Sequence, residues 1–360
     1  MTAACLLPDL PAGARILILR LRSIGDIVLL TPALRLLKQW RPDLRISVLV
    51  ETRFRDLLQA NPAVDEILTP GEGSGARRLL SRLAVTRALR RRGFSLCINL
   101  HGGPTSRTFA RWSGARWRVG FAHYRGATLY NVLVPDARTI LNQPSLHTAE
   151  HQAAAFFYLG MPRKEIPRAQ IFSGEGQAEW WHAKRASLGI ASEQAYAIVH
   201  PAASYKTKEW ATEKFARIGE YLEREAHLAA IYSCGPGEAP VLDAVEKASG
   251  APLRRLEGMT LAQFAAALAE ARLFVGNDSG PAHMAAALAR PVVVIFGSSS
   301  SPIWGPWPRE HASSRIVQNP FDCNPCPGDR CYRFDNPECI LSVTFDQVKD
   351  AVQAALSEST

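Results

Sequence analysis

The chain has 360 residues, of which 47% are hydrophobic and 21% are charged. This composition is typical of a globular protein, and the length suffices for two domains of ordinary size. No apolar run reaches the ~18–20 residues that a membrane-spanning helix needs. The chain also begins without a basic stretch before an apolar block, so the sequence predicts a cytoplasmic protein without a signal peptide.

The formal net charge of +9 is unevenly distributed along the chain. No Asp or Glu occurs between Gly73 and Val134, while arginine recurs throughout that interval. Such a face attracts anionic lipid, nucleic acid or a phosphorylated substrate. The alternative is a solvated helix face without a specific partner.

The first half of the chain alternates short apolar strands with helical stretches. Strands are predicted at residues 15–21, 45–50, 65–69, 95–100 and 118–121. Helices are predicted at residues 27–40, 76–92 and 147–159. Pro32 is expected to kink the first helix or to lie in its opening turn.

The second half repeats this alternation. Strands are predicted at residues 196–201, 228–233, 253–258, 273–278 and 292–297. Helices are predicted at residues 211–225, 240–248, 261–271, 281–289 and 345–356. Two such series predict an α/β protein with two doubly wound parallel sheets. The expected domains are residues 1–175 and 190–342, followed by a last helix in 343–360 that packs back toward the first domain.

The stretch LRSIGDIVLLTPAL, residues 21–34, directly follows the first predicted strand. Gly25 permits a tight turn there, and Asp26 stands at the start of the next helix. Aspartate is a common helix cap, and a carboxylate at this place can also serve as a general base. The sequence leaves both roles open, and one residue can hold both.

Two further loops follow predicted strands of the second half. In HPAASYKTKEW, residues 200–210, small residues let a ligand approach the backbone beside Lys206 and Lys208. A lysine there can hold a pyrophosphate without a metal, or both lysines are simply exposed. In YSCGPGE, residues 232–238, Glu238 can accept from a ribose hydroxyl or act as an acid in a first helical turn. A lone G-x-G is a weak sign of nucleotide binding.

The stretch GNDSGPAHMAAALARPVVVIFG, residues 276–297, carries a polar cluster between two apolar strands. Asn277, Asp278 and Ser279 end the first of these strands, and His283 lies in the short helix that follows. Ligands bind at this edge of open parallel sheets, and a helix N-terminus favours anions. The cluster is therefore a candidate anion-binding site.

Four of the seven cysteines form a cluster with the spacing C-x2-C-x4-C-x7-C: Cys323, Cys326, Cys331 and Cys339. In a cytosolic chain such a cluster favours a metal site over disulfides. Zinc is the first expectation and an iron–sulfur cluster the second. The alternative is a set of reduced cysteines in a structured loop, because the spacings fit no standard zinc ribbon. Any metal is expected to be structural, since the segment lies outside the other motifs.

Taken together, the motifs resemble glycosyltransferase family 9, the ADP-heptose:lipopolysaccharide heptosyltransferases. The matching stretches follow the order of the family: LRSIGDIVLLTPAL, HPAASYKTKEW, GMTLAQ (258–263) and GNDSGPAHMAAALARPVVVIFG. The resemblance covers nearly the whole chain, least clearly residues 70–95 and 162–192. It implies a GT-B fold, in which two Rossmann-like doubly wound domains face each other across a cleft. The acceptor is then expected on the N-terminal domain and the donor nucleotide on the C-terminal one.

The resemblance also implies roles for individual residues. Asp26 matches the proposed catalytic base of the family, and Lys208 matches the lysine that holds the phosphates of the donor. Met259 matches a residue beside the adenine, and Glu238 loosely matches an acid that contacts the ribose. The element D-[ST]-G-x-x-H, which contacts the donor sugar and diphosphate, is matched by Asp278, Ser279, Gly280 and His283.

The function so implied is inverting transfer of a heptosyl or related sugar from an ADP-sugar to an acceptor of the lipopolysaccharide core. No D-x-D pair lies at a strand end, so no cofactor is expected to be required for catalysis. The expected partners are the ADP-sugar, a phosphorylated glycolipid and the inner-membrane surface, which makes the protein cytoplasmic and peripheral to that membrane.

Three alternatives remain at the level of the sequence. The chain can use another nucleotide sugar and glycan acceptor, or it can be a non-catalytic binding protein with two domains. Binding of nucleic acid through the arginine-rich stretch is not expected, because the chain contains no recognised nucleic-acid module.

Overall fold

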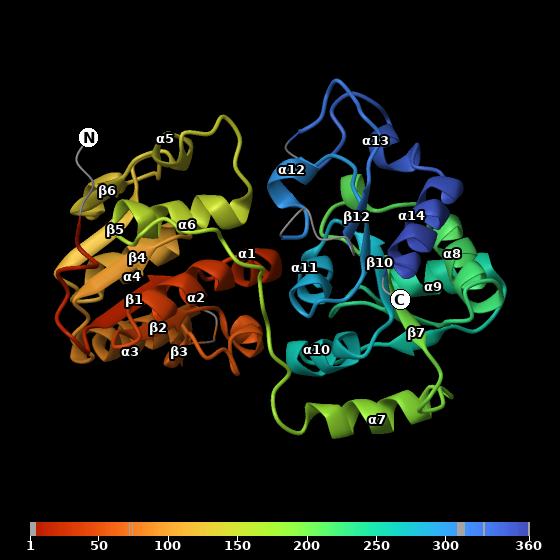
Figure 1. The fold of residues 1–360 in the computed structure, drawn as a ribbon, viewed down its shortest axis with the longest axis horizontal. Coiled ribbons are helices and arrows are strands. Elements are labelled where there is room, and N and C mark those ends of the chain that lie inside the picture. Colours follow the sequence, from red (N-terminus) through yellow and green to blue (C-terminus); the bar gives the residue numbers. More distant parts are fainter. Residues whose placement is uncertain (1–4, 72, 74, 308–313, 327, 359–360) are drawn as a thin grey trace. The chain divides into compact units, whose positions relative to one another are not determined.

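The computed structural model describes residues 5–71, 73, 75–307, 314–326 and 328–358. The chain divides into two compact units, Met1–Phe172 and Ser173–Thr360 (Figure 1). The division lies three residues before the expected end of the first domain at residue 175.

The first unit is built on a parallel sheet of six strands in the order β3-β2-β1-β4-β5-β6. The strands are β1 (Arg15–Leu19), β2 (Arg45–Leu49), β3 (Glu66–Leu68), β4 (Leu96–Asn99), β5 (Trp117–Phe121) and β6 (Val132–Val134). The α-helices are α1 (Ile24–Val28), α2 (Thr31–Trp40), α3 (Gly75–Arg91), α4 (Pro104–Trp112), α5 (Ala137–Leu141) and α6 (Thr148–Tyr158). Short 3-10 helices are η1 (Thr52–Leu57) and η2 (Ala127–Leu129).

The second unit repeats this plan with the order β12-β11-β10-β7-β8-β9, again all parallel. Its strands are β7 (Tyr196–His200), β8 (Ala229–Ser233), β9 (Arg254–Leu256), β10 (Leu273–Asn277), β11 (Val292–Ile295) and β12 (Ser314–Val317). Its helices are α7 (Gln177–Ser187), η3 (Lys206–Lys208), α8 (Thr212–Arg224), α9 (Ala239–Ser249), α10 (Leu261–Ala269), α11 (Gly280–Ala287), α12 (Ser301–Trp304), α13 (Glu338–Leu341) and α14 (Phe345–Ser357).

The central strands of each sheet are buried over nearly their whole length. In β1 only Arg15 is exposed, and every residue of β7 and β10 is buried. Parallel strands covered by helices on both faces have this continuous apolar character. The predicted α/β class with two doubly wound sheets is therefore confirmed.

The strand order reverses beside the first strand of each sheet. In the first unit β1 lies between β2 and β4, and in the second β7 lies between β8 and β10. At such a switch point the loops after the two central strands diverge, and ligands bind at the carboxyl ends of these strands. The loops after β1, β4, β7 and β10 are thus the places to look for a site.

The position of the last helix differs from the expectation. The residues Val348, Val352 and Ala355 of α14 are fully buried and belong to the same core as Phe215 and Val293 of the second unit. The helix packs against α8, β11 and β12 (Figure 1). The prediction that it packs back toward the first domain is therefore wrong, because its apolar face completes the second core.

Among the described residues, no helix has both the length and the apolar character that crossing a membrane requires.

Candidate active site

In the first unit, Asp26 lies in the tight turn that leads from β1 into α1. Ser23 is the N-cap of this helix, and its backbone N–H and hydroxyl both donate to Asp26 Oδ2 over 3.1 Å. Asp26 Oδ1 accepts from the guanidinium of Arg20. Asp26 is therefore not the cap itself but the third residue of the helix, whose carboxylate reaches back to the cap. A carboxylate held on both oxygens has a fixed direction.

Side chains that the sequence did not single out surround Asp26 from other segments of the first unit. Gln152 on α6 donates from Nε2 to the Asp26 carbonyl oxygen over 3.0 Å. His101 follows β4, the strand beside β1, and His151 lies on α6 one turn after the helix begins. The switch point of the sheet and the α6 segment therefore converge on Asp26.

The two histidines near Asp26 are uncharged at neutral pH. Burial lowers the pKa of His101, and the nearby charges of Arg20 and Arg22 lower it further. Burial and then the neighbouring His123 lower the pKa of His151 to about 4. The His151 ring also stacks on Phe121, with ring centroids 4.4 Å apart. Neutral imidazoles can donate and accept hydrogen bonds, which suits the recognition of sugar hydroxyls.

In the second unit, the structure brings Lys208 and Asp278 together. Lys208 Nζ donates to Asp278 Oδ2 over 2.7 Å, from the turn after β7 to the loop after β10. The Asp278 side chain is 6% exposed and the Lys208 side chain 22%. Lys206 differs, because its side chain is 83% exposed and pairs with Glu209 in its own turn. Of the two lysines, Lys208 is the one that faces the switch point.

Asn277 ties these two loops together and explains one polar residue at the end of a buried strand. Its Oδ1 accepts from the backbone N–H of Trp210 over 3.1 Å, and its Nδ2 donates to the Pro201 carbonyl over 2.8 Å. The residue is fully buried. Asn277 is thus a structural residue that fixes the loop carrying Lys208 beside β10.

The helix α11 begins two residues after Asp278. Ser279 is its N-cap, and the Ser279 Oγ is buried without a hydrogen-bond partner among the described residues. Gly280 begins the helix, and His283 on its first turns is 6% exposed. The predicted residues of this element thus lie together at one helix N-terminus, where the dipole favours an anion.

The other two predicted donor residues lie after β8 and β9, on the far side of β7 from β10. Glu238 Oε2 accepts from the Gly235 N–H over 2.7 Å, so one carboxylate oxygen is used within its own turn. Met259 is partly buried and precedes Thr260, the N-cap of α10. The predicted donor residues of this unit therefore lie in the loops, or in the start of the helix, that follow the carboxyl ends of β7, β8, β9 and β10.

The four clustered cysteines line a single cavity of about 40 Å³ in the second unit, together with Thr207 and Ser298. All four are free thiols. Within the described ranges, no three or more His, Cys, Asp or Glu side chains are arranged as a metal site. The proposed metal therefore stays a prediction.

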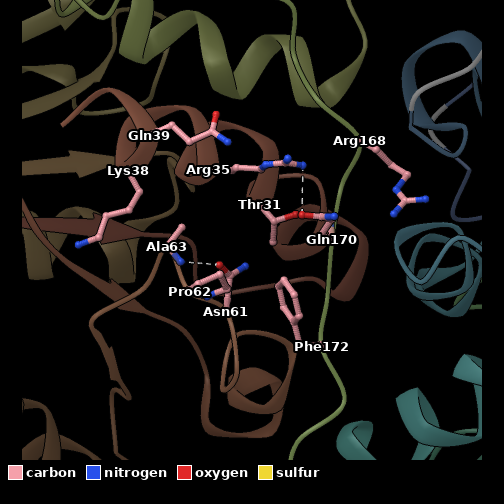
Figure 2. A pocket seen from close by; sticks show the side chains of 10 residues that line it. All are labelled: Thr31, Arg35, Lys38, Gln39, Asn61, Pro62, Ala63, Arg168, Gln170 and Phe172. Atoms are coloured by element: carbon pink, nitrogen blue, oxygen red, sulfur yellow. Dashed lines mark hydrogen bonds between the residues drawn. The ribbon is translucent and has the colours of Figure 1, made fainter. Parts of the chain in front are cut away.

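A basic pocket in the first unit was not anticipated from the sequence. It has a volume of about 260 Å³ and includes Arg35, Lys38 and Arg168 in its lining (Figure 2). Two of these cations are already engaged, because Lys38 pairs with Asp65 over 2.8 Å and Arg35 donates to Gln170 over 3.2 Å. The pocket lies between α2 and the segment after α6, and Asp26 does not line it.

Known proteins share both the sequence pattern and the fold. The chain is 25% identical over 293 residues to lipopolysaccharide heptosyltransferase 3 of Escherichia coli K12, covering 80% of this chain and 83% of that protein. It is also 25% identical over 352 residues to lipopolysaccharide heptosyltransferase 2 of Salmonella typhimurium, covering 96% and 99%.

Solved structures match the fold over nearly the whole length. A family 9 glycosyltransferase from Veillonella parvula superposes with a TM-score of 0.81 at 21% identity, covering 99% of both chains. The E. coli ADP-heptose lps heptosyltransferase II superposes with a TM-score of 0.76 at 19% identity, covering 96% of this chain and 99% of that one. The fold is thus the GT-B fold of these structures.

The sequence model of one family matches residues 82–333, well over half of the chain, and its description is glycosyltransferase family 9 (heptosyltransferase). The match includes the turn of Lys208 and the helix after Asp278. Together with the two doubly wound sheets, it shows that this chain is a glycosyltransferase and belongs to glycosyltransferase family 9.

Proposed function

We propose that the enzyme transfers a heptosyl or closely related sugar from an ADP-sugar to an acceptor of the lipopolysaccharide core, with inversion at the anomeric carbon. The observation that carries the proposal is the Lys208–Asp278 pair beside the N-terminus of α11. The names of the relatives support the sugar and the acceptor, since two are lipopolysaccharide heptosyltransferases and one is an ADP-heptose enzyme.

On the donor side, Lys208 would neutralise the diphosphate as it leaves. Its ion pair with Asp278 holds the ammonium in one direction before any donor arrives. The hydroxyl of Ser279 and the N-terminus of α11 would add hydrogen bonds to the same oxygens. Donors that are in place before the reaction stabilise developing charge without reorganisation. Glu238 and Met259 would contact the ribose and the adenine.

On the acceptor side, Asp26 would act as the general base. It removes the proton from an acceptor hydroxyl, whose oxygen forms a bond to the anomeric carbon while the bond from that carbon to ADP breaks. The electron pair leaves with ADP, and attack from the opposite face inverts the configuration. Arg20 and Ser23 fix the direction of the carboxylate. A metal is not required for these steps.

The test is a comparison of ADP-, GDP- and UDP-sugars with the purified enzyme, by thermal shift and by transfer to lipopolysaccharide core acceptors truncated before and after each heptose. We expect ADP and ADP-heptose to raise the unfolding temperature and ADP-heptose to be turned over.

Lys208→Ala should weaken ADP binding roughly 10- to 150-fold, the effect of losing a charge-assisted hydrogen bond. Lys206→Ala is the matched control and should change little. Equal losses for both lysines, or stabilisation by UDP- or GDP-sugars alone, contradict the proposal. Stabilisation without turnover would favour a binding protein.

A membrane surface is the proposed location of the acceptor. On α3, Leu80 and Leu83 are 66% and 51% exposed, and Trp112 at the end of α4 is 44% exposed. The guanidinium groups of Arg90 and Arg111 lie 5.9 and 4.8 Å from the Trp112 ring. We call these five residues the α3–α4 patch. Exposed apolar side chains among arginines suit an interface of acyl chains and anionic headgroups. The enzyme would therefore work at the cytoplasmic face of the inner membrane.

A further inference from the structure

The cavity that the four cysteines line also touches the turn that carries Lys208. Cys339 at the start of α13 is 7% exposed, and the other three cysteines are partly buried. The same cavity is lined by Thr207, the residue before Lys208, and by Ser298 in the loop after β11. Residues 320–342, which we call the cysteine segment, are therefore next to the proposed donor site in the fold, although they are distant from it in the sequence.

Hydrogen bonds attach the cysteine segment to two loops of the sheet edge. The Thr207 hydroxyl donates to the carbonyl of Gly328, which lies between Cys326 and Cys331. Asn324 Nδ2 donates to the Gly297 carbonyl over 2.8 Å.

The backbone adds a third attachment on the same side. The N–H of Cys326 donates to the Ser298 carbonyl over 3.1 Å. The segment thus contacts the donor turn and the end of β11 at once.

The chain after Cys339 continues this contact. Trp210 Nε1 donates to the Val343 carbonyl over 2.8 Å, and Lys214 Nζ donates to the same oxygen over 2.6 Å. Packing is tight where α13 meets the loop after β11. A Cβ at Gly297 would lie 2.6 Å from the Thr207 carbonyl oxygen and 2.7 Å from Ile340 Cβ. A displacement of the segment would therefore be transmitted to Thr207 and Trp210, on either side of Lys208.

Among the described residues from 321 to 338, only Gly328 is buried. The cysteine segment is rich in Pro and polar residues, and Tyr332 and Phe334 are 58% and 40% exposed. Two polar atoms at the cavity, Ser298 Oγ and Asn324 Oδ1, are buried without a hydrogen-bond partner among the described residues. A segment with few apolar contacts and incompletely satisfied polar atoms needs a further constraint to stay ordered.

We propose that Cys323, Cys326, Cys331 and Cys339 bind one thiophilic divalent ion, Zn²⁺ or Fe²⁺, and that this site braces the Lys206–Lys208 turn for donor binding. Each thiol gives up its proton as its sulfur becomes a ligand, so four protons are released to solvent. Binding draws the four sulfurs, which already share one cavity, into a tetrahedral shell. The site is structural, as expected from the sequence, but it is not remote from the donor. The expected effect of the metal on the affinity for ADP rests on the proposed function, whereas the metal site itself does not.

The first test measures the metal itself. We expect one zinc or iron ion per chain in protein purified without added metal, and Co²⁺ that replaces it should show thiolate-to-cobalt absorption. Cys326→Ser and Cys331→Ser should lower the bound metal, while the exposed Cys5→Ser is the control and should retain it. Protein that lacks metal after both aerobic and anaerobic purification, with all four thiols freely titratable, overturns the proposal. Inorganic sulfide in the purified protein would indicate an iron–sulfur cluster and would overturn the proposal of a single bound ion.

The second test measures the brace. Removing the metal with a chelator should speed amide hydrogen exchange at residues 206–210, a readout that requires no donor. Thr207→Val should keep the metal and weaken ADP binding about 2- to 10-fold, the effect of one lost hydrogen bond. Unchanged exchange together with unchanged ADP affinity overturns the brace. A wild-type enzyme that holds the metal and shows the exchange effect without binding ADP supports this inference and contradicts the proposed donor instead.

Discussion

At the scale of single residues, Asp26 depends on contacts from three parts of the first unit. Arg20 at the end of β1 and Ser23 in the turn hold its carboxylate, and Gln152 on α6 holds its backbone carbonyl. A carboxylate that only capped a helix would not need a guanidinium and a second segment. The arrangement therefore favours a base with a fixed direction that also serves the helix.

Replacing Asp26 by Asn tests this role. The amide keeps the shape of the side chain but cannot accept the proton of the acceptor, so we expect the turnover rate to fall on the order of 10²–10⁴-fold. ADP affinity should stay the same, because the proposed donor residues belong to the second unit. The measurement is transfer under saturating donor together with calorimetry for ADP. Asp43→Asn, which breaks a surface ion pair with Arg41, is the control. A folded Asp26→Asn protein with wild-type turnover would show that Asp26 only supports the helix.

The pH dependence of stability is set in part by His200. Burial lowers the pKa of this histidine to about 4, while an unfolded histidine titrates near 6.5. Between these values the unfolded chain binds a proton that the folded one excludes. The contribution of the neutral ring is thus complete above pH 6.5 and is lost as the pH falls toward 4.

We expect this loss to amount to about 3 kcal/mol of unfolding free energy at pH 4. Urea unfolding at several pH values between 7 and 4.5 measures it. His200→Gln cannot take up the proton and should flatten the curve relative to the wild type. The exposed His182→Gln is the control for loss of an imidazole. A His200→Gln curve parallel to the wild-type curve would contradict the assignment.

Residues that follow a strand within a few positions could be placed from the sequence. Lys208 and Asp278 were expected at one sheet edge, and the structure joins them by an ion pair. The neighbours of Asp26 could not be placed in this way. Arg20 directly follows the apolar strand β1, and His151 lies more than a hundred residues away on α6. Only the order of the strands in the sheet brings such residues together, and that order cannot be predicted from any local sequence pattern.

At the scale of elements, strong apolar periodicity located the central strands and most helices within a few residues. Several elements were missed, and three of them have weak signals. The strands β6 and β12 are short and lie at the sheet edges, where burial is incomplete. The helix α7 lies in a polar segment and buries little besides Trp181 and Arg185. The predicted helix 27–40 divides at Leu29–Leu30, and Pro32 lies in the first turn of the second part.

The corrected position of α14 gives a prediction at this scale. Val352→Ala removes two buried carbons from the core of the second unit and should lower its unfolding free energy by roughly 1–3 kcal/mol. Hydrogen exchange should become faster across residues 173–358 while residues 5–172 stay protected. Gln353→Ala, one residue further on the exposed side, is the matched control. Faster exchange confined to residues 5–172 would indicate that α14 packs against the first unit, as the sequence predicted.

At the scale of the whole molecule, the two units share one sheet topology and one placement of the candidate site residues. Each sheet places its first strand beside its fourth, and each candidate site uses the loops that follow these two strands. Asp26 follows β1 as Lys208 follows β7, and His101 follows β4 as Asp278 follows β10. The chemistry differs, because the first unit offers a carboxylate among neutral imidazoles and the second offers an ammonium and a helix N-terminus. The proposed base for a sugar hydroxyl and the proposed site for a diphosphate thus come from one architecture.

Membrane binding is the last property of the whole molecule that can be tested. If the α3–α4 patch contacts lipid, the enzyme should sediment with phosphatidylglycerol vesicles and much less with phosphatidylcholine vesicles, and salt should weaken the binding. The double variant Leu80→Glu with Leu83→Glu should weaken binding at least about 10-fold, because two apolar anchors are lost. Leu133→Glu, which changes a 43% exposed leucine on β6, is the control and should bind like the wild type. Turnover with a water-soluble acceptor analogue should remain the same in all three proteins, since none of these residues touches Asp26 or Lys208. Equal sedimentation with neutral and anionic vesicles, or an equal loss in the Leu133 variant, would show that this patch is not the membrane contact.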